Sequence, residues 1–370
     1  MADGMRQEVV ALQPGIVQHF VVFAREHRLL PEAWLYGLAF TDRFSRHRLA
    51  YFAGEYRESG WVAFFPAAFV LKTTLPALAL GALGLLAILR RRPRNRTLYR
   101  LAPLLAFAGI YVVFSLTSSL NIGHRHLLPL YPLFYIVAGS ALLFTRRRIA
   151  VAFILALAVW HAFETLRVRP HYLTYFNQLA GGPTGGHRYF ADSSLDWGQG
   201  LPELKTWLDA QAGTQPVYLS YFGSDNPVHA GIRATRIGDI YFDHAPMRAV
   251  LPALEPGLYV ISATMLHRVY TQVRGAWSES YEREYQRLVR WHATTRGRAP
   301  DERFNADDKP MDEATYVAEL TRLEQLRFGR LCRFLENRAP DAMVANVFFV
   351  HRLDAEEIQR ALTGPVTFRP

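Results

Sequence analysis

In the sequence Asn121-Ile-Gly-His-Arg-His-Leu-Leu-Pro-Leu-Tyr-Pro132, three side chains that can carry a positive charge stand directly before a long apolar run. They are His124, Arg125 and His126. Arg125 is the only formally charged residue between Leu101 and Thr145, and a histidine stands on either side of it. An ionisable group at a membrane boundary is costly unless it faces water, a partner or a ligand. We therefore interpret Arg125 either as a binding group for an anion or as an anchor that reaches from a helix end to the lipid headgroups.

Charge is unevenly divided along this chain of 370 residues, half of which are apolar. Residues 1–166 hold 18 Lys and Arg against 8 Asp and Glu, whereas residues 167–370 hold 24 of each, so the whole net charge of +10 lies in the first part. The basic residues flank apolar segments, as in membrane proteins, and do not form the folded basic face typical of nucleic-acid binding. We expect a protein of the lipid bilayer that has no nucleic-acid partner.

Apolar stretches that are long enough, or nearly so, to cross a bilayer occupy residues 61–89, 101–116, 127–144 and 149–166. Lys72 is the only charge in the first stretch, where Pro66 and Pro76 permit a break. The predicted fold class is therefore an α-helical membrane region of about four transmembrane helices over residues 61–166, followed by a soluble α/β domain over residues 167–370.

The predicted α/β domain contains compact apolar, β-branched runs bounded by Gly and Pro, which are typical of strands: Val217–Phe222, Leu258–Ala263 and Val347–Val350. Mixed-charge segments with helical spacing predict helices over residues 201–211, 278–292 and 313–337. The glycine-rich run at residues 181–186 lacks the Lys-Ser/Thr of a nucleotide-binding loop, so we interpret it as a turn that links the membrane region to the domain.

The distribution of basic residues near the span ends predicts the orientation. Residues 90–100 and 146–148 hold nine Arg, against six basic residues near the span ends on the opposite side. The positive-inside rule places these two loops in the cytoplasm of a bacterium. Residues 1–60, the loop around Arg125 and the domain over residues 167–370 are then expected outside the inner membrane.

Residues 1–60 show no signal peptide, and they interleave aromatic residues such as Phe40 and Phe44 with arginines. This pattern predicts an amphipathic, interfacial segment on the membrane surface, or equally a helical hairpin packed on the rest of the protein. Because such a segment has no signal of its own for crossing the membrane, we expect an upstream N-terminal half of the same enzyme with further spans.

Two sets of motifs together resemble a known family. The first set is Gly60-Trp61, Phe64-Phe65-Pro66, Lys72-Thr73-Thr74-Leu75-Pro76 and the Asn121–Pro132 stretch. The second set is Tyr175-Phe176-Asn177, Ala180-Gly181-Gly182-Pro183 and Asp192-Ser193-Ser194-Leu195-Asp196-Trp197-Gly198-Gln199. Over about residues 50–200 the chain is similar to the C-terminal membrane half of bacterial polyprenyl-phosphate-sugar-dependent glycosyltransferases, the family 39, protein O-mannosyltransferase-like enzymes of the GT-C superfamily.

The resemblance implies an integral membrane glycosyltransferase that passes a sugar from a polyprenyl-phosphate donor to an acceptor at the outer face of the membrane, without a cofactor. Enzymes of this family use an acidic base in their first outward loop, near the N-terminus of the full-length protein. This chain has no acidic residue between its first two predicted spans. The catalytic residue is therefore unassigned, and the alternative is a non-catalytic membrane-anchored module whose extracytoplasmic domain binds a glycan or a protein.

A phosphate leaving group needs positive charge fixed near the membrane surface. The candidate donor-binding residues are Lys72, Asn121, His124, Arg125, His126 and Tyr131. A second candidate site comprises Asp192, Asp196, Trp197 and Gln199, because carboxylates four residues apart can share a helix face, although Asp192-Ser193-Ser194 equally fits a helix N-cap. Lys72 is otherwise a headgroup anchor. The two histidines have no carboxylate nearby in sequence, so we expect no metal site.

Overall fold

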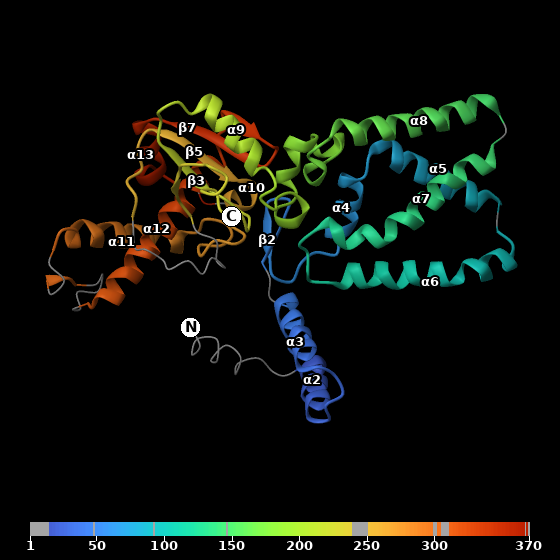
Figure 1. The fold of residues 1–370 in the computed structure, drawn as a ribbon, viewed down its shortest axis with the longest axis horizontal. Helices are drawn as coiled ribbons and strands as arrows, with labels where there is room; N and C mark the ends of the chain where they lie inside the picture. Colours follow the sequence, from blue (N-terminus) through green and yellow to red (C-terminus); the bar gives the residue numbers. More distant parts are fainter. Residues whose placement is uncertain are drawn as a thin grey trace.

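A computed structural model describes residues 15–46, 49–91, 93–145, 147–238, 251–298, 302–304, 311–366 and 368. Figure 1 shows three parts: a helical hairpin near the N-terminus, a group of apolar helices, and an α/β part. Residues 1–14 of the predicted surface segment, together with Arg92 and Arg146 of the predicted cytoplasmic loops, lie outside the described residues.

The N-terminal part is helical only as far as Arg46. Helix α2 (Ile16–Glu26) and helix α3 (Glu32–Arg46) form an antiparallel hairpin with a small core of its own, made by Val21, Ala24 and Leu35. A β-hairpin follows, with β1 (Ala50–Phe52) paired to β2 (Glu55–Arg57). Its two turn residues, Ala53 (φ 51°) and Gly54 (φ 92°), are left-handed, which suits the twist of a tight hairpin.

The apolar helices begin with α4 (Phe64–Lys72) and α5 (Leu75–Arg91), which meet at an angle of 110°. They continue with α6 (Asn95–Thr117), the short 3₁₀ helix η1 (His124–Leu130), α7 (Tyr131–Gly139), η2 (Ser140–Phe144) and α8 (Arg148–Arg167). Helix α5 packs closely on α7, because a Cβ at Gly84 would lie 1.8 Å from the carbonyl oxygen of Val137.

The predicted fold class, with four transmembrane helices followed by a soluble domain, is wrong. In the described parts of the chain only α6 and α8 are long and apolar enough to cross a membrane, or three spans if the bent pair α4–α5 is counted as one. The third predicted stretch is divided into η1, α7 and η2, and α7 alone has nine residues. The first is broken between Lys72 and Leu75, next to Pro76. The chain is instead a mixed α/β structure with helices throughout and a five-stranded sheet.

The sheet has the strand order β4-β3-β5-β7-β6. Strands β3 (Val217–Ser220), β4 (Thr235–Arg236) and β5 (Gly257–Ser262) are parallel, whereas β7 (Phe348–Leu353) runs antiparallel to β5 and to β6 (Ala342–Val344). All six residues of β5 are buried at the centre of the sheet. Strands β3, β5 and β7 coincide with the three stretches that the sequence predicts as strands, to within a few residues at their ends.

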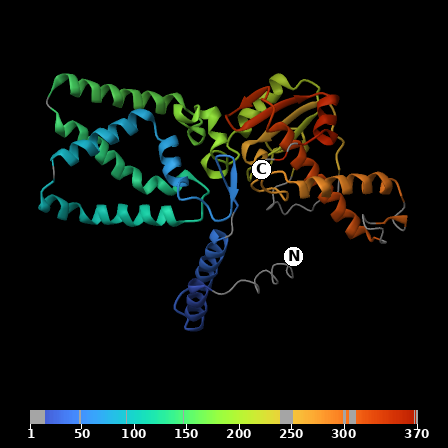
Figure 2. The ribbon, with the colours of Figure 1, turned by 180° about the vertical axis from the view of Figure 1, so that it is seen from behind.

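Helices complete the α/β part: α9 (Leu201–Gln211), α10 (Ala263–Leu266), α11 (Glu279–Thr295), α12 (Glu313–Leu335) and α13 (Ala355–Thr363). Four 3₁₀ turns lie between α8 and α9: η3 (Tyr172–Thr174), η4 (Gln178–Ala180), η5 (Pro183–Arg188) and η6 (Asp192–Ser194). Figure 2 shows this segment, in yellow-green, between the apolar helices and the sheet. The glycine-rich run is therefore a connector, and the chain passes through it from one part to the other.

Candidate functional site

The loop between α6 and η1 is held in place by Asn121, which is 3% exposed. Its Oδ1 accepts a hydrogen bond from the backbone N–H of Trp61 (2.6 Å), and its Nδ2 donates to the carbonyl of Ser118 (3.1 Å). Gly60, with φ of +69°, lies so close that a Cβ there would be 2.7 Å from Asn121 Oδ1. The structure thus gives this candidate donor ligand a structural role, because both ends of its amide are engaged.

His124 belongs to a chain of hydrogen bonds. Its Nε2 lies 2.7 Å from the hydroxyl of Tyr131, which lies 2.6 Å from the hydroxyl of Thr73 at the end of α4. Burial, together with the charge of Lys72, lowers the pKa of His124 to about 3, and burial beside Arg125 lowers that of His126. Both imidazoles are therefore neutral at pH 7, so the positive charge expected from the histidines is absent.

Lys72 ends α4 and ties it to two connecting segments. Its ammonium donates to the carbonyls of Leu173 (2.7 Å) and Ser194 and lies 4.3 Å from the ring centroid of Phe176. In the described chain no carboxylate lies within ion-pair distance of this ammonium. Lys72 therefore holds these segments together.

Polar groups at the break between α4 and α5 form hydrogen bonds with residues that the sequence did not single out as functional. Asn177, which is fully buried, donates from Nδ2 to the carbonyls of Val70 (2.6 Å) and Thr73 (2.8 Å), the groups left free where a helix ends. On the other side of the break, the hydroxyl of Thr74 lies 2.8 Å from Nδ1 of His161 on α8. Non-helical backbone among apolar helices is tolerated only with such partners.

Arg125 faces solvent. The carbon of its guanidinium lies 5.6 Å from the ring centroid of Trp197, which is itself 49% exposed. No ion pair joins Arg125 to a carboxylate of the described residues, and its guanidinium lies over the Trp197 ring. An exposed cation held over an aromatic face remains free to bind an anion.

The two acidic residues of the second candidate site face the sheet. Asp192 accepts hydrogen bonds from the hydroxyls of Tyr270 and Ser193 (3.0 Å), and its own N–H donates to Thr264 (3.0 Å). Its φ of 55° is left-handed, as such a tight turn requires. Asp192 lies within η6 and is not the N-cap of an α-helix, so neither the cap nor the shared helix face predicted for it is observed.

Asp196 is completely buried, and its Oδ1 accepts a hydrogen bond from the N–H of Gly198 (3.0 Å). Burial raises the pKa of Asp196 to about 7, although the Gly198 N–H and the Ser262 hydroxyl at the end of β5 oppose the rise. Gln199 folds back on the same loop, where it accepts from the N–H of Trp197 (2.7 Å) and donates to the carbonyl of Leu195 (3.1 Å). Of the four predicted residues, Trp197 and Gln199 are exposed, whereas both carboxylates are buried.

The structure brings the two candidate sites together into one region, which we call the junction and define as residues 121–131 and 192–199. The N–H of His124 donates to the hydroxyl of Ser194 (3.1 Å), and a Cβ at Gly123 would lie 2.7 Å from that of Ser193. Lys72 and Arg125 each contact the 192–199 loop as well. The junction therefore presents the guanidinium of Arg125 while its own carboxylates point inward.

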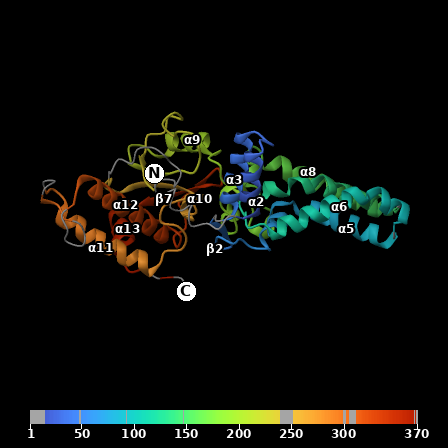
Figure 3. The same cartoon turned by 90° about the horizontal axis from the view of Figure 1, so that it is seen from below.

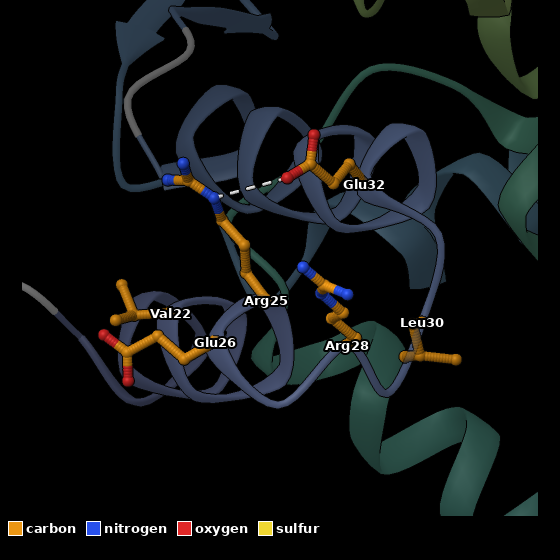
Figure 4. A pocket seen from close by; sticks show the side chains of 6 residues that line it. All are labelled: Val22, Arg25, Glu26, Arg28, Leu30 and Glu32. Carbon is orange, nitrogen blue, oxygen red and sulfur yellow. Dashed lines mark ion pairs between the residues drawn. The ribbon is translucent and has the colours of Figure 1, made fainter.

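A surface pocket lies elsewhere, on the α2–α3 hairpin (Figure 4), and is lined by Val22, Arg25, Glu26, Arg28, Leu30 and Glu32. Arg25 is paired there with Glu32 (3.5 Å), so the pocket offers little net charge to an anion. Among the residues that the structure describes, no group of three or more His, Cys, Asp or Glu side chains is arranged to hold a metal ion.

No protein-family model matches the chain, and the comparisons with curated proteins and with solved structures found no match. Any assignment of function therefore depends on the residues of the junction themselves.

Proposed function

We propose that this chain is an integral membrane glycosyltransferase, or the C-terminal portion of one, which binds a polyprenyl-phosphate-linked sugar at the junction. The sugar passes to an acceptor at the outer face of a bacterial inner membrane. Support comes from the position of the junction, because Figure 1 draws it at one end of α6 and α8, the two helices long enough to cross a bilayer. A lipid whose chain lies beside these helices would have its headgroup at that level.

The observation that carries the proposal is Arg125, an exposed guanidinium without a carboxylate partner in the described chain. Guanidinium groups bind phosphate oxygens through paired, charge-assisted hydrogen bonds. The two carboxylates of the junction are turned toward the sheet. A phosphate therefore meets attraction at the junction without repulsion from nearby acidic groups.

Trp197 suits the sugar of such a donor. Its ring is about half exposed and lies beside Arg125, with Phe222 6.2 Å away between ring centroids. The C–H face of a pyranose packs well on an aromatic ring, because both surfaces are apolar. A phosphate on Arg125 would leave the attached sugar within reach of this ring.

The binding step is tested with farnesyl phosphate, a short polyprenyl phosphate, on the detergent-solubilised full chain. Arg125→Ala is expected to raise the Kd about tenfold or more, because a hydrogen bond to a charged group contributes about 1.5–3 kcal/mol. Arg233→Ala, which changes an exposed arginine of the α/β part, is the matched control and should leave the Kd unchanged. Farnesol should bind weakly to every variant, and equal binding of farnesol and farnesyl phosphate would refute the phosphate site.

A second candidate is a non-catalytic membrane-anchored module whose extracytoplasmic domain binds a glycan or a protein and takes no part in sugar transfer. One observation favours it: both carboxylates of the junction are buried and hydrogen-bonded, so neither is placed as an accessible base. Sugar transfer in membranes of the native cell separates the two functions. The enzyme requires transfer to fall with Arg125→Ala, whereas transfer that stays intact favours the module.

A further inference from the structure

The α2–α3 hairpin carries more apolar surface than its own packing uses. In α2, Val17, Val21 and Ala24 face α3, and in α3 Leu35 faces back. Among its exposed large apolar residues, Ile16, Phe20, Phe23 and Trp34 are between 42% and 88% exposed. A contiguous exposed apolar surface of this kind marks an interaction site.

These four residues lie on one side of the hairpin. Ile16, Phe20 and Phe23 directly precede the inward residues of α2, and Trp34 directly precedes Leu35 of α3. Antiparallel helices rotate in opposite senses when viewed along one direction, so the positions that precede the inward residues in both helices point to the same side. We call this side the apolar side.

The opposite side of the hairpin is mixed: the exposed Val22 and Tyr36 lie there beside polar residues. The residues that follow the inward positions include Gln18, whose Nε2 donates to Asp42 (2.7 Å), and Arg25, whose Nε pairs with Glu32 (3.5 Å). Both interactions cross from α2 to α3, and Figure 4 shows Arg25 reaching toward Glu32 across the hairpin. The polar interactions that join the two helices therefore lie on the side away from Ile16, Phe20, Phe23 and Trp34.

The placement of the hairpin indicates what covers its apolar side. In Figures 1 and 3 the hairpin runs across the direction of α6 and α8, beside the end of these helices at which the junction lies. If α6 and α8 cross a bilayer, a helix pair that runs across them at that level lies along the membrane surface. Amphipathic helices in this position bury their apolar face about 5–10 Å into the boundary between headgroups and acyl chains.

We propose that the α2–α3 hairpin is an interfacial membrane anchor, with Ile16, Phe20, Phe23 and Trp34 inserted in the lipid and the Gln18–Asp42 and Arg25–Glu32 side facing water. It fixes the level of the junction relative to the lipid headgroups. The β1–β2 hairpin takes no part in this contact, because Phe52 pairs with Phe190 and packs on the protein.

The full chain in vesicles of phosphatidylethanolamine and phosphatidylglycerol tests the anchor. The sole cysteine, Cys332, is fully buried, and burial raises its pKa to about 12, so an introduced cysteine can be labelled selectively. Phe20→Cys with an environment-sensitive fluorophore is expected to be quenched severalfold more strongly by doxyl-labelled lipid than by aqueous iodide. Arg25→Cys, on the opposite side, should show the reverse.

Equal access of iodide to the labels at positions 20 and 25 would overturn the anchor. A label at position 20 shielded from both quenchers would also overturn it, since protein, such as a second copy of this chain, would then cover the apolar side. Neither outcome bears on the binding of farnesyl phosphate at Arg125, so the anchor and the proposed function can fail separately.

Discussion

The exposed cation of the junction has no acidic partner, whereas the buried cations of the α/β part are paired with carboxylates. In the α/β part, Arg330 is paired with Glu282 (2.9 Å), and the buried Arg268 is paired with Glu336 of the α12 C-cap (3.0 Å). At the junction, the exposed Arg125 has no carboxylate partner among the described residues. A neutralised buried cation stabilises a fold, whereas an uncompensated cation at a surface attracts an anion, so the difference separates residues of structure from residues of binding.

Replacing a buried, ion-paired arginine should give the largest loss of stability. Arg330 is 2% exposed and also donates to the carbonyls of Ala361 and Gly364. Arg330→Met removes the charged partner of Glu282, which keeps Trp277 and Gln286 as donors, and removes the guanidinium from both carbonyls. The free energy of unfolding should fall by about 3–5 kcal/mol. Guanidinium titration followed by tryptophan fluorescence measures the change. Arg360→Met, which removes an exposed pair with Glu356, should change stability by less than about 0.5 kcal/mol.

The inward carboxylate Asp196 should make the stability depend on pH. Its pKa rises from 3.8 in the unfolded chain to about 7 in the fold, so the folded state holds the proton more tightly. This contribution to stability is complete below pH 3.8 and is lost as the pH rises through 7, by on the order of 4 kcal/mol. Asp196→Asn should abolish that loss, whereas the exposed Asp225→Asn should not. Parallel curves for wild type and Asp196→Asn between pH 4 and 8 would contradict the buried protonated carboxyl.

A substitution at Lys72 tests whether this residue is structural or binds the ligand directly. Lys72→Met removes the donor from the carbonyls of Leu173 and Ser194, and the free energy of unfolding should fall by about 1–3 kcal/mol. Lys205→Met, at an exposed pair with Asp209, is the control. If Lys72→Met weakened binding of farnesyl phosphate with no loss of stability, its role in tying the segments together would be wrong.

The sequence predicts local elements well because their determinants are local. The apolar, β-branched runs of β3, β5 and β7 and the spacing of α9, α11 and α12 specify these elements without reference to the rest of the chain. The prediction of four spans is wrong because the length of an apolar stretch does not reveal where a helix breaks. The break after Lys72 is stabilised by Asn177, 104 residues from the Thr73 carbonyl that it caps, and such a contact exists only in the fold.

The sequence predicts which residues make up the candidate site, but it does not predict what each of them does. The Asn121–Pro132 stretch and the Asp192–Gln199 run were both singled out, yet only the fold shows that they touch, through His124 and Ser194. The inward direction of Asp192 depends on Tyr270, 78 residues away, and the neutrality of the histidines depends on burial. Arg125 is the residue whose predicted availability as a cation agrees with its surroundings in the structure.

The smallest expected effect is that of replacing Trp197. It tests whether the indole ring positions the exposed Arg125, which distinguishes the junction from the paired cations of the α/β part. A cation–π contact at an exposed site contributes about 0.5–1 kcal/mol, so Trp197→Leu should raise the Kd for farnesyl phosphate about two- to fivefold through Arg125 alone. In the Arg125→Ala background the same change should then have no further effect, since the cation it positions is gone. Trp207→Leu, in α9 away from the junction, controls for the loss of an indole. Additive effects of Trp197→Leu and Arg125→Ala would mean that the indole contacts the lipid phosphate or its prenyl chain by itself, and the aromatic support of the guanidinium would be refuted.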